Sequence, residues 1–192
     1  MDLLWIVDAQ KDFIDPDGKL TVDAPIRVRI IMKNVLSWAK KNKFAIGYSQ
    51  DWHEMSDEEL SESPNFKQTF PEHCIAGTQG AELIPEISTT AILNDFFCIK
   101  KTVFNVWDEN HGGGKELKDF VEKNNPENIY VMGVATDVCV KFAVLGFLEN
   151  YKDKNVYVIE DAVWGLSIDS SNNAIMEMKD KGAKLVKYED LE

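Results

Sequence analysis

The chain has 192 residues, of which 44% are hydrophobic and 28% are charged, a composition typical of a globular protein with a sizeable core. Its 33 acidic and 21 basic residues give a formal net charge of −12. This charge argues against nucleic acid or an anionic membrane as the main partner, because either would require a basic surface. No apolar run approaches the length of a membrane span, and we expect one domain over residues 1–192.

The cysteine content indicates the compartment. The chain contains three cysteines, Cys74, Cys98 and Cys139, too few and too scattered for a disulfide framework. The N-terminus leads directly into a predicted strand, without a signal peptide. We therefore expect a reduced, cytoplasmic protein.

The first quarter of the chain predicts a strand, a turn, a helix and a second strand. Residues 3–7 form a short apolar run, as expected for a buried strand, and the sequence Asp15-Pro16-Asp17-Gly18 predicts a turn. Over residues 24–41, apolar residues recur at helical spacing with Lys and Arg between them, which is typical of an amphipathic helix on one face of a sheet. Residues 44–49 predict the second strand.

A long segment without periodicity follows. Residues 50–90 contain several prolines and glycines, and a loop of this length in a compact domain is usually functional. A short helix is expected near residues 58–60.

The remainder of the chain alternates strands with helices. An apolar run at 91–94 precedes strands at 96–100, 128–132, 156–159 and 184–186, with helices at 115–123, from 136 to 148, and at 170–181. This alternation predicts an α/β fold of three αβα layers, Rossmann-like, with a mostly parallel six-stranded sheet.

Reactive side chains follow four of the predicted strands. Asp8 follows the first, Asp51 and His53 the second, Lys101 the third and Cys139 the fourth. In an open parallel sheet, ligands bind beyond the carboxyl ends of the strands, so these side chains are expected at one edge. Taken singly, Asp8 could be a turn residue, Lys101 a solvated strand end and Cys139 a small buried residue.

Cys139 has the surroundings expected of a nucleophile. It falls in the first turn of a predicted helix, with Thr136 and Asp137 as candidate N-cap residues, and helix N-termini favour a thiolate. No histidine in this segment could act as its base. A carboxylate beside a lysine could do so, and Asp8 and Lys101 supply that pair, with the lysine expected to lower the pKa of both the carboxyl and the thiol.

A second group has the character of a metal site. In extended chain the side chains of Asp51 and His53 point the same way. With His73 they form a mixed oxygen and nitrogen set that suits zinc, iron or manganese and leaves positions open for water and substrate. The alternative is that His73 is a loop histidine without a ligand role.

An ordered set of motifs between residues 3 and 165 resembles the isochorismatase-like cysteine hydrolase superfamily. The motifs are Asp8-x-Gln10-x-Asp12-Phe13, Asp51-x-His53, Gly77-Thr78, Lys101 followed by an aromatic residue, and Gly133-Val134-Ala135-Thr136-Asp137-x-Cys139-Val140. Within the superfamily, the Asp-x-His pair and the pattern Phe70-Pro71-x-His73-x-x-x-Gly77-Thr78-x-Gly80 are most similar to nicotinamidases. Each motif is weak alone, whereas the ordered set is specific.

The resemblance implies the isochorismatase-like hydrolase fold and a set of site residues. Asp8, Lys101 and Cys139 match the catalytic triad, and Asp51, His53 and His73 match the ligands of one divalent metal ion. The bond between Val134 and Ala135 matches a cis peptide. The implied substrate site comprises an oxyanion hole made of the backbone amides of Ala135 and Cys139, and the substrate-binding residues Phe13, Trp107, Val134 and Ala135.

The implied activity is hydrolysis of nicotinamide to nicotinate and ammonia through a cysteine thioester, an amidase step of NAD salvage, in a protein that is often a homo-oligomer. Two departures leave alternatives open. Glu58, Glu59 and Glu62 are all candidates for a fourth residue at the metal site, and Trp107 stands where phenylalanine is commoner. The alternative substrate is another small amide or ureido compound, and the alternative of another class is a non-catalytic binding or thiol redox-sensor protein.

Overall fold

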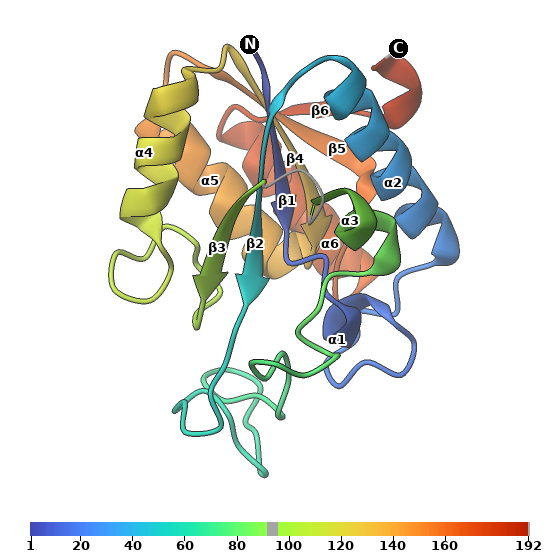
Figure 1. Cartoon of the computed structure of the whole chain (residues 1–192), viewed down its shortest axis with the longest axis vertical. Coiled ribbons are helices and arrows are strands. Elements are labelled where there is room, and N and C mark those ends of the chain that lie inside the picture. Colours follow the sequence, from blue (N-terminus) through green and yellow to red (C-terminus); the bar gives the residue numbers. More distant parts are fainter. Residues whose placement is uncertain (92–95, 192) are drawn as a thin grey trace.

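A six-stranded sheet forms the centre of the computed structural model, which describes residues 1–91 and 96–191 (Figure 1). The strands run in the order β3-β2-β1-β4-β5-β6, and all neighbouring pairs are parallel. Their bounds are β1 Leu3–Val7, β2 Ala45–Asp51, β3 Phe97–Lys101, β4 Asn128–Val134, β5 Asn155–Trp164 and β6 Lys184–Val186. The continuously apolar sequence of β1 fits a central parallel strand that is buried on both faces. The predicted parallel α/β architecture is confirmed.

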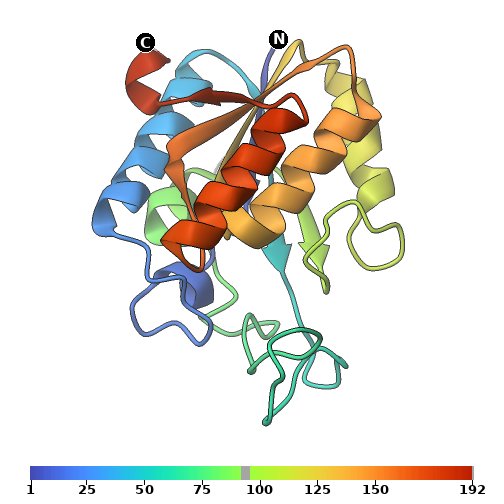
Figure 2. The same ribbon diagram turned by 180° about the vertical axis from the view of Figure 1, so that it is seen from behind.

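Helices cover both faces of this sheet. α2 and α3 lie on one face, and α4, α5 and α6 lie on the other (Figures 1 and 2). A π-helical turn, Thr136–Val140, leads directly into α5. The helices are α1 Lys11–Ile14, α2 Ile26–Lys41, α3 Pro85–Ala91, α4 Gly114–Asn124, α5 Lys141–Asn150 and α6 Ile168–Asp180, followed near the C-terminus by the 3-10 turn Tyr188–Asp190.

The hydrophobic core has two parts because the side chains of a strand alternate between faces. Leu4 of β1 belongs to the cluster that contains Met32 and Leu36 of α2. Trp5 belongs to the opposite cluster, where its ring packs edge-on against Phe147 of α5, with ring centroids 6.3 Å apart. The apolar stripe of α2 is thus buried as its helical spacing predicts.

Some local predictions were wrong. Residues 58–60 form turns rather than a helix, and Leu60 makes an isolated bridge with Phe70. α1, α3 and the final 3-10 turn were not predicted, since each is short. The apolar run predicted at 91–94 lies, after its first residue, outside the described part of the chain. The long connection between β2 and α3 projects beyond the carboxyl ends of the strands, at the bottom of Figure 1.

The strand order reverses direction between β1 and β4, and such a switch point is the usual ligand crevice of an open α/β sheet. Val7 at the end of β1 pairs with Gly133 of β4. Gly133 has a φ of 127°, and a Cβ atom there would lie 2.0 Å from the Val7 carbonyl oxygen, so only glycine allows the two strands to approach. Asp8 and Cys139 follow these two strands.

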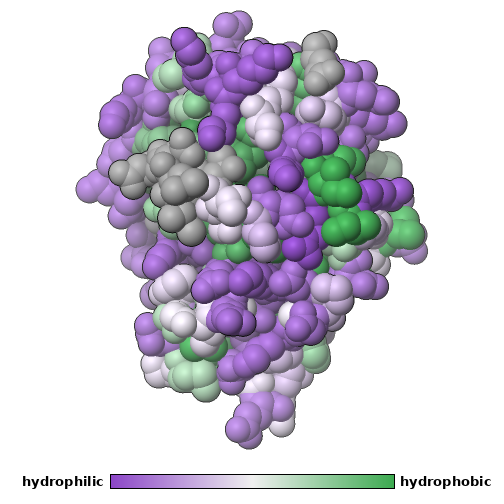
Figure 3. All heavy atoms as spheres, turned by 45° about the vertical axis from the view of Figure 1, so that its right-hand side comes forward, coloured by the Kyte–Doolittle hydropathy of each residue, from purple (hydrophilic) through white to green (hydrophobic). Residues whose placement is uncertain are grey.

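The surface is mostly hydrophilic on the face shown in Figure 3. Apolar side chains gather there in small separate groups. Over residues 1–91 and 96–191, no helix has the length and apolar character needed to cross a membrane.

Candidate active site and metal centre

The ammonium group of Lys101 lies among three reactive side chains at the carboxyl edge of the sheet. Its Nζ atom is 2.8 Å from Oδ2 of Asp8 and 3.8 Å from Sγ of Cys139. It also forms an ion pair with Oδ1 of Asp51. All four side chains are buried, and Lys101 is only 1% exposed. The structure therefore brings the predicted triad together and joins it to a predicted metal ligand.

Asp8 is held in place by the end of β2. Its backbone adopts a φ of 45°, and its amide donates a hydrogen bond to the Ser49 carbonyl oxygen at 3.2 Å. The Ser49 hydroxyl donates to Oδ1 of Asp8 at 2.7 Å, which leaves Oδ2 facing Lys101. Ser49 was not predicted as a site residue, because a serine inside a strand carries no signal of its own.

Burial dominates the electrostatics of the triad. It raises the pKa of the Cys139 thiol well above its ordinary range, and the nearby Lys101 charge only partly offsets this. Burial likewise raises the pKa of Asp8, against the opposing effect of Lys101. Although burial lowers the pKa of Lys101, the charges of Asp51 and Asp8 raise it well above its usual value. Lys101 thus lowers the pKa of the thiol and of the carboxyl, as predicted, but burial outweighs this effect and the net pKa of each group is raised.

The turn that carries Cys139 differs from a regular helix start. It follows a cis peptide bond between Val134 and Ala135, as predicted. The Ala135 carbonyl oxygen accepts hydrogen bonds from the amides of Val138 and Val140, both at 3.1 Å. Ala135, rather than Thr136 or Asp137, occupies the N-cap position, and no side chain caps this turn.

The side chains of Asp51, His53 and His73 form a compact buried group. One potential ligand atom from each lies within 4.8 Å of the others. Four buried atoms of this region have no hydrogen-bond partner among the described residues: Oδ2 of Asp51, Nε2 of His53, Nε2 of His73 and Oε1 of Glu59. Unpartnered buried polar atoms are costly, and a cation shared by Asp51, His53 and His73 would satisfy the atoms of these three residues. The donor set of two imidazoles and carboxylates suits a divalent metal ion.

Outer contacts orient this group. Nδ1 of His73 lies 2.7 Å from the Pro71 carbonyl oxygen, and Nδ1 of His53 lies 3.2 Å from a carboxylate oxygen of Asp57. Because both oxygens are acceptors, these contacts favour a proton on each Nδ1 atom, and in the neutral imidazole each Nε2 atom then has a lone pair for a metal.

Gln10 fixes the position of Asp51, the carboxylate of the metal group. Its Nε2 donates to the Asp51 carbonyl oxygen and its Oε1 accepts from the Asp51 amide, both at 2.7 Å. This buried pair of hydrogen bonds holds the backbone of Asp51 at the end of β2. Gln10 belongs to the first motif of the sequence, but its role was not predicted.

Of the three candidate glutamates, Glu59 is the one whose charge interacts with Asp51 and His73 of the metal group. Glu58 and Glu62 are exposed, whereas Glu59 is half-buried and its Oε1 is inaccessible and unpartnered. Burial and the charge of Asp51 raise the pKa of Glu59 to about 7, with a smaller opposite effect from His73. The structure thus separates three candidates that the sequence left equivalent.

A cavity of about 210 Å³ opens beside the sulfur of Cys139. Phe13, Val134 and Ala135 line it, in agreement with their predicted positions. The remaining lining residues are all apolar: Leu20, Val22, Phe66, Phe70, Phe104, Val138 and Leu166. The cavity is therefore suited to a small, flat, uncharged group placed against the thiol.

The prediction for Trp107 was wrong. It does not line the cavity: its ring packs edge-on against Phe147 at 5.0 Å, and its Nε1 donates to the Ala143 carbonyl oxygen at 3.0 Å. Phe104 lines the cavity instead, three residues after Lys101, and its ring contacts Phe70 at 4.8 Å. The aromatic residue that lines the cavity after Lys101 is therefore Phe104 and not Trp107.

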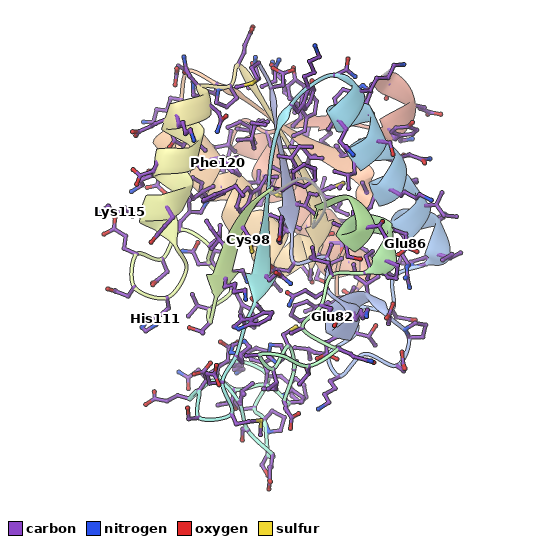
Figure 4. The ribbon with its side chains drawn as sticks, viewed as in Figure 1. Glu82, Glu86, Cys98, His111, Lys115 and Phe120 are labelled. Carbon is purple, nitrogen blue, oxygen red and sulfur yellow. The ribbon has the colours of Figure 1, made fainter. Side chains whose placement is uncertain are left out.

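The third histidine has no part in this site. His111 lies on the loop before α4, where Figure 4 places it at the outer edge of the molecule, and it is exposed.

The chain is similar to known proteins over nearly its whole length. The isochorismatase domain model matches residues 2–190. The nicotinamidase of Escherichia coli is 30% identical, over 98% of this chain and 96% of its own. The pyrazinamidase of Pyrococcus horikoshii, solved in complex with zinc, is 27% identical with a TM-score of 0.81, covering 97% of this chain and 98% of its own. PnC1 of L. infantum, solved in complex with nicotinate, is 25% identical with a TM-score of 0.82, and the match covers 98% of this chain and 93% of its own.

Proposed function

The chain belongs to the isochorismatase family of hydrolases, and we propose that it hydrolyses nicotinamide to nicotinate and ammonia. The observation that carries this proposal is the buried Lys101 between Asp8, Cys139 and Asp51, beside an apolar cavity. Relatives named nicotinamidase match nearly the whole chain, which supports the choice of substrate. Formation of nicotinate would give the protein a role in NAD salvage.

In the first half of the reaction, Asp8 accepts the thiol proton of Cys139 while the sulfur attacks the carboxamide carbon. The raised thiol pKa makes this transfer necessary, since little thiolate exists beforehand. The backbone amides of Ala135 and Cys139 stabilise the oxyanion of the tetrahedral intermediate. Asp8 then returns the proton to the departing nitrogen, which leaves as ammonia, and an acyl thioester remains on Cys139.

In the second half, Asp8 takes a proton from a water molecule that attacks the thioester carbon. The new intermediate collapses to the carboxylic acid product, and the sulfur leaves as a thiolate that recovers its proton from Asp8. Lys101 remains charged throughout, since its pKa is raised well above the usual value. It therefore orients Asp8 and lowers the free energy of the transient thiolate.

Asp51, His53 and His73 would hold a divalent metal ion, which we assign as zinc, with iron or manganese as the alternatives, and Glu59 would complete the site. The unpartnered buried atoms of these four residues support the assignment, as does the zinc complex of the Pyrococcus horikoshii relative. When bound, the ion would take the ring nitrogen of nicotinamide as a ligand and so orient the carboxamide towards the thiol.

The test is ammonia release by the purified, zinc-loaded protein from nicotinamide, benzamide and a panel of small aliphatic amides and ureido compounds. We expect rapid release from nicotinamide and much slower release from benzamide, which lacks the ring nitrogen. Release from an aliphatic or ureido compound alone would overturn the substrate. No release from any of them would favour a binding or redox role.

A further inference from the structure

Two strongly exposed apolar side chains stand at the mouth of the cavity. Phe66 is 62% exposed and Leu166 is 60% exposed, yet both line the same cavity as the buried Cys139. They belong to segments a hundred residues apart, one in the long loop after β2 and the other just after β5. Apolar groups that remain in water beside a cavity often mark a place that a ligand covers.

The position of Phe66 is fixed by its own turn. The Oδ1 atom of Asn65 accepts hydrogen bonds from the amides of Lys67, Gln68 and Thr69, at 2.9, 2.8 and 3.1 Å. The Phe66 amide donates to the Thr69 carbonyl oxygen at 2.9 Å, and its φ is 54°. This bonding stabilises the backbone of the turn, from which the Phe66 ring remains largely exposed.

The ring of Phe66 continues an aromatic wall. It meets Phe70 edge-on at 6.3 Å between centroids, and Phe70 meets Phe104 edge-on at 4.8 Å. All three side chains line the cavity. The wall therefore extends from the inner part of the cavity to its mouth.

Leu166 is tied to the turn that carries Cys139. Its amide donates to Oδ1 of Asp137, within the π-helical turn, at 3.1 Å. At the preceding residue, Gly165, a Cβ atom would lie only 2.5 Å from the same oxygen, so glycine permits this close approach. This hydrogen bond joins the backbone of Leu166 to the turn that contains Cys139.

We propose that Phe66 and Leu166 are specificity-determining residues that close over the outer edge of a flat aromatic ring. They would favour neutral heteroaromatic carboxamides and disfavour rings with a charged or bulky outer substituent, because two apolar side chains cannot replace the water around a charge. This inference rests on the proposed hydrolysis of aromatic amides and identifies which members of that class are accepted.

The test compares Phe66→Ala and Leu166→Ala with two matched controls. Lys67→Ala alters an exposed neighbour in the same turn, and Ile168→Ala truncates a 70% exposed apolar residue close to Leu166 that does not line the cavity. The substrates are nicotinamide and two derivatives, carrying a methyl group or a carboxylate on the ring carbon meta to both the ring nitrogen and the carboxamide. Both kcat and KM are measured for each.

We expect each mouth variant to raise KM for nicotinamide by about threefold to tenfold with little change in kcat, as loss of a partly buried apolar contact predicts. The kcat/KM of the carboxylate derivative relative to nicotinamide should rise in these variants and stay unchanged in the controls. Phe66→Leu, which keeps an apolar side chain, should retain most of the discrimination. Unchanged relative kcat/KM values in both mouth variants would overturn the proposal.

A binding measurement separates this inference from the proposed function. Should the wild-type protein release no ammonia from nicotinamide, calorimetric titration with benzamide still measures occupancy of the cavity. Weaker benzamide binding in Phe66→Ala and Leu166→Ala, but not in the controls, would show that these two residues contact the ring. This result would support the inference even if the proposed hydrolysis were wrong. Equal binding in all variants, or no binding to the wild-type protein, would refute the inference.

Discussion

Lys101 and Asp51 form a direct ion pair in the interior, although one was predicted as a catalytic residue and the other as a metal ligand. Lys101 also pairs with Asp8, so a single positive charge faces two buried carboxylates. A divalent cation on the far side of Asp51 would compensate the excess negative charge. The triad and the metal group are therefore electrostatically dependent on one another.

Replacing Lys101 should strongly destabilise the protein. In Lys101→Met both carboxylates lose their cation, and removal of one partner from a buried ion pair typically costs about 3–5 kcal/mol. The control is Lys100→Met on the same strand, where an exposed ammonium lies 3.3 Å from the centroid of the Trp52 ring and contributes about 1 kcal/mol or less. Urea unfolding of metal-free samples measures the free energy of unfolding of both variants. A similar decrease in Lys101→Met and Lys100→Met would contradict the buried ion pairing.

Removing the sulfur should separate binding from turnover. Cys139→Ala is expected to release no ammonia from nicotinamide, while the affinity for nicotinamide stays within about threefold of the wild-type value, because the cavity wall and the metal group are unchanged. Calorimetric titration and an ammonia assay on the same preparation measure the two properties. Ammonia release that survived the substitution would exclude the thioester route.

The three glutamates of the long loop should differ in their effect on metal affinity. Glu59→Gln is expected to weaken zinc binding by about 10- to 100-fold, because it replaces the carboxylate proposed to complete the site by a neutral amide. Glu58→Gln and Glu62→Gln are matched controls, since both side chains are exposed. Competition with a chromophoric chelator gives the three affinities. Equal zinc affinities in the three variants would show that Glu59 is not part of the metal site. In a separate test, removal of the metal by a chelator should stop nicotinamide turnover.

The pH dependence of thiol alkylation should follow the raised pKa of Cys139. Burial raises that pKa, so the reactive thiolate is scarce at neutral pH and its fraction rises about tenfold for each pH unit below the pKa. Alkylation of Cys139 by iodoacetamide should therefore be slow at pH 7 and still accelerate above pH 9. Loss of the neighbouring positive charge in Lys101→Met should slow it further at each pH. Peptide mass spectrometry gives the rates, and fast alkylation that does not vary with pH would contradict the assignment.

The sequence was sufficient for the framework of the site. Asp8, Lys101 and Cys139 converge because parallel strands end at one edge, and each strand was recognisable as a short apolar run ending in a reactive residue. The same reasoning located Asp51 and His53. The comparisons confirmed the isochorismatase-family resemblance that these motifs indicated.

Other features depend on tertiary contacts that no local pattern encodes. Glu59 differs from Glu58 and Glu62 only in the direction that an aperiodic loop gives its side chain. The choice between Phe104 and Trp107 depends on which ring α5 covers. The net direction of the Cys139 pKa shift depends on the depth of burial, which spacing alone does not supply.

The strand order also divides the chemistry between two contiguous stretches of polypeptide. β1, β2 and β3 contribute both carboxylates and the ammonium, all within the first 101 residues, whereas the sulfur arrives with β4. Neither fragment alone would contain a reactive centre, however well it folded. The chain could be divided in the loop around His111 and the two fragments mixed. Activity would then appear only when the fragments associate through the pairing of β1 with β4, where Val7 lies opposite Gly133.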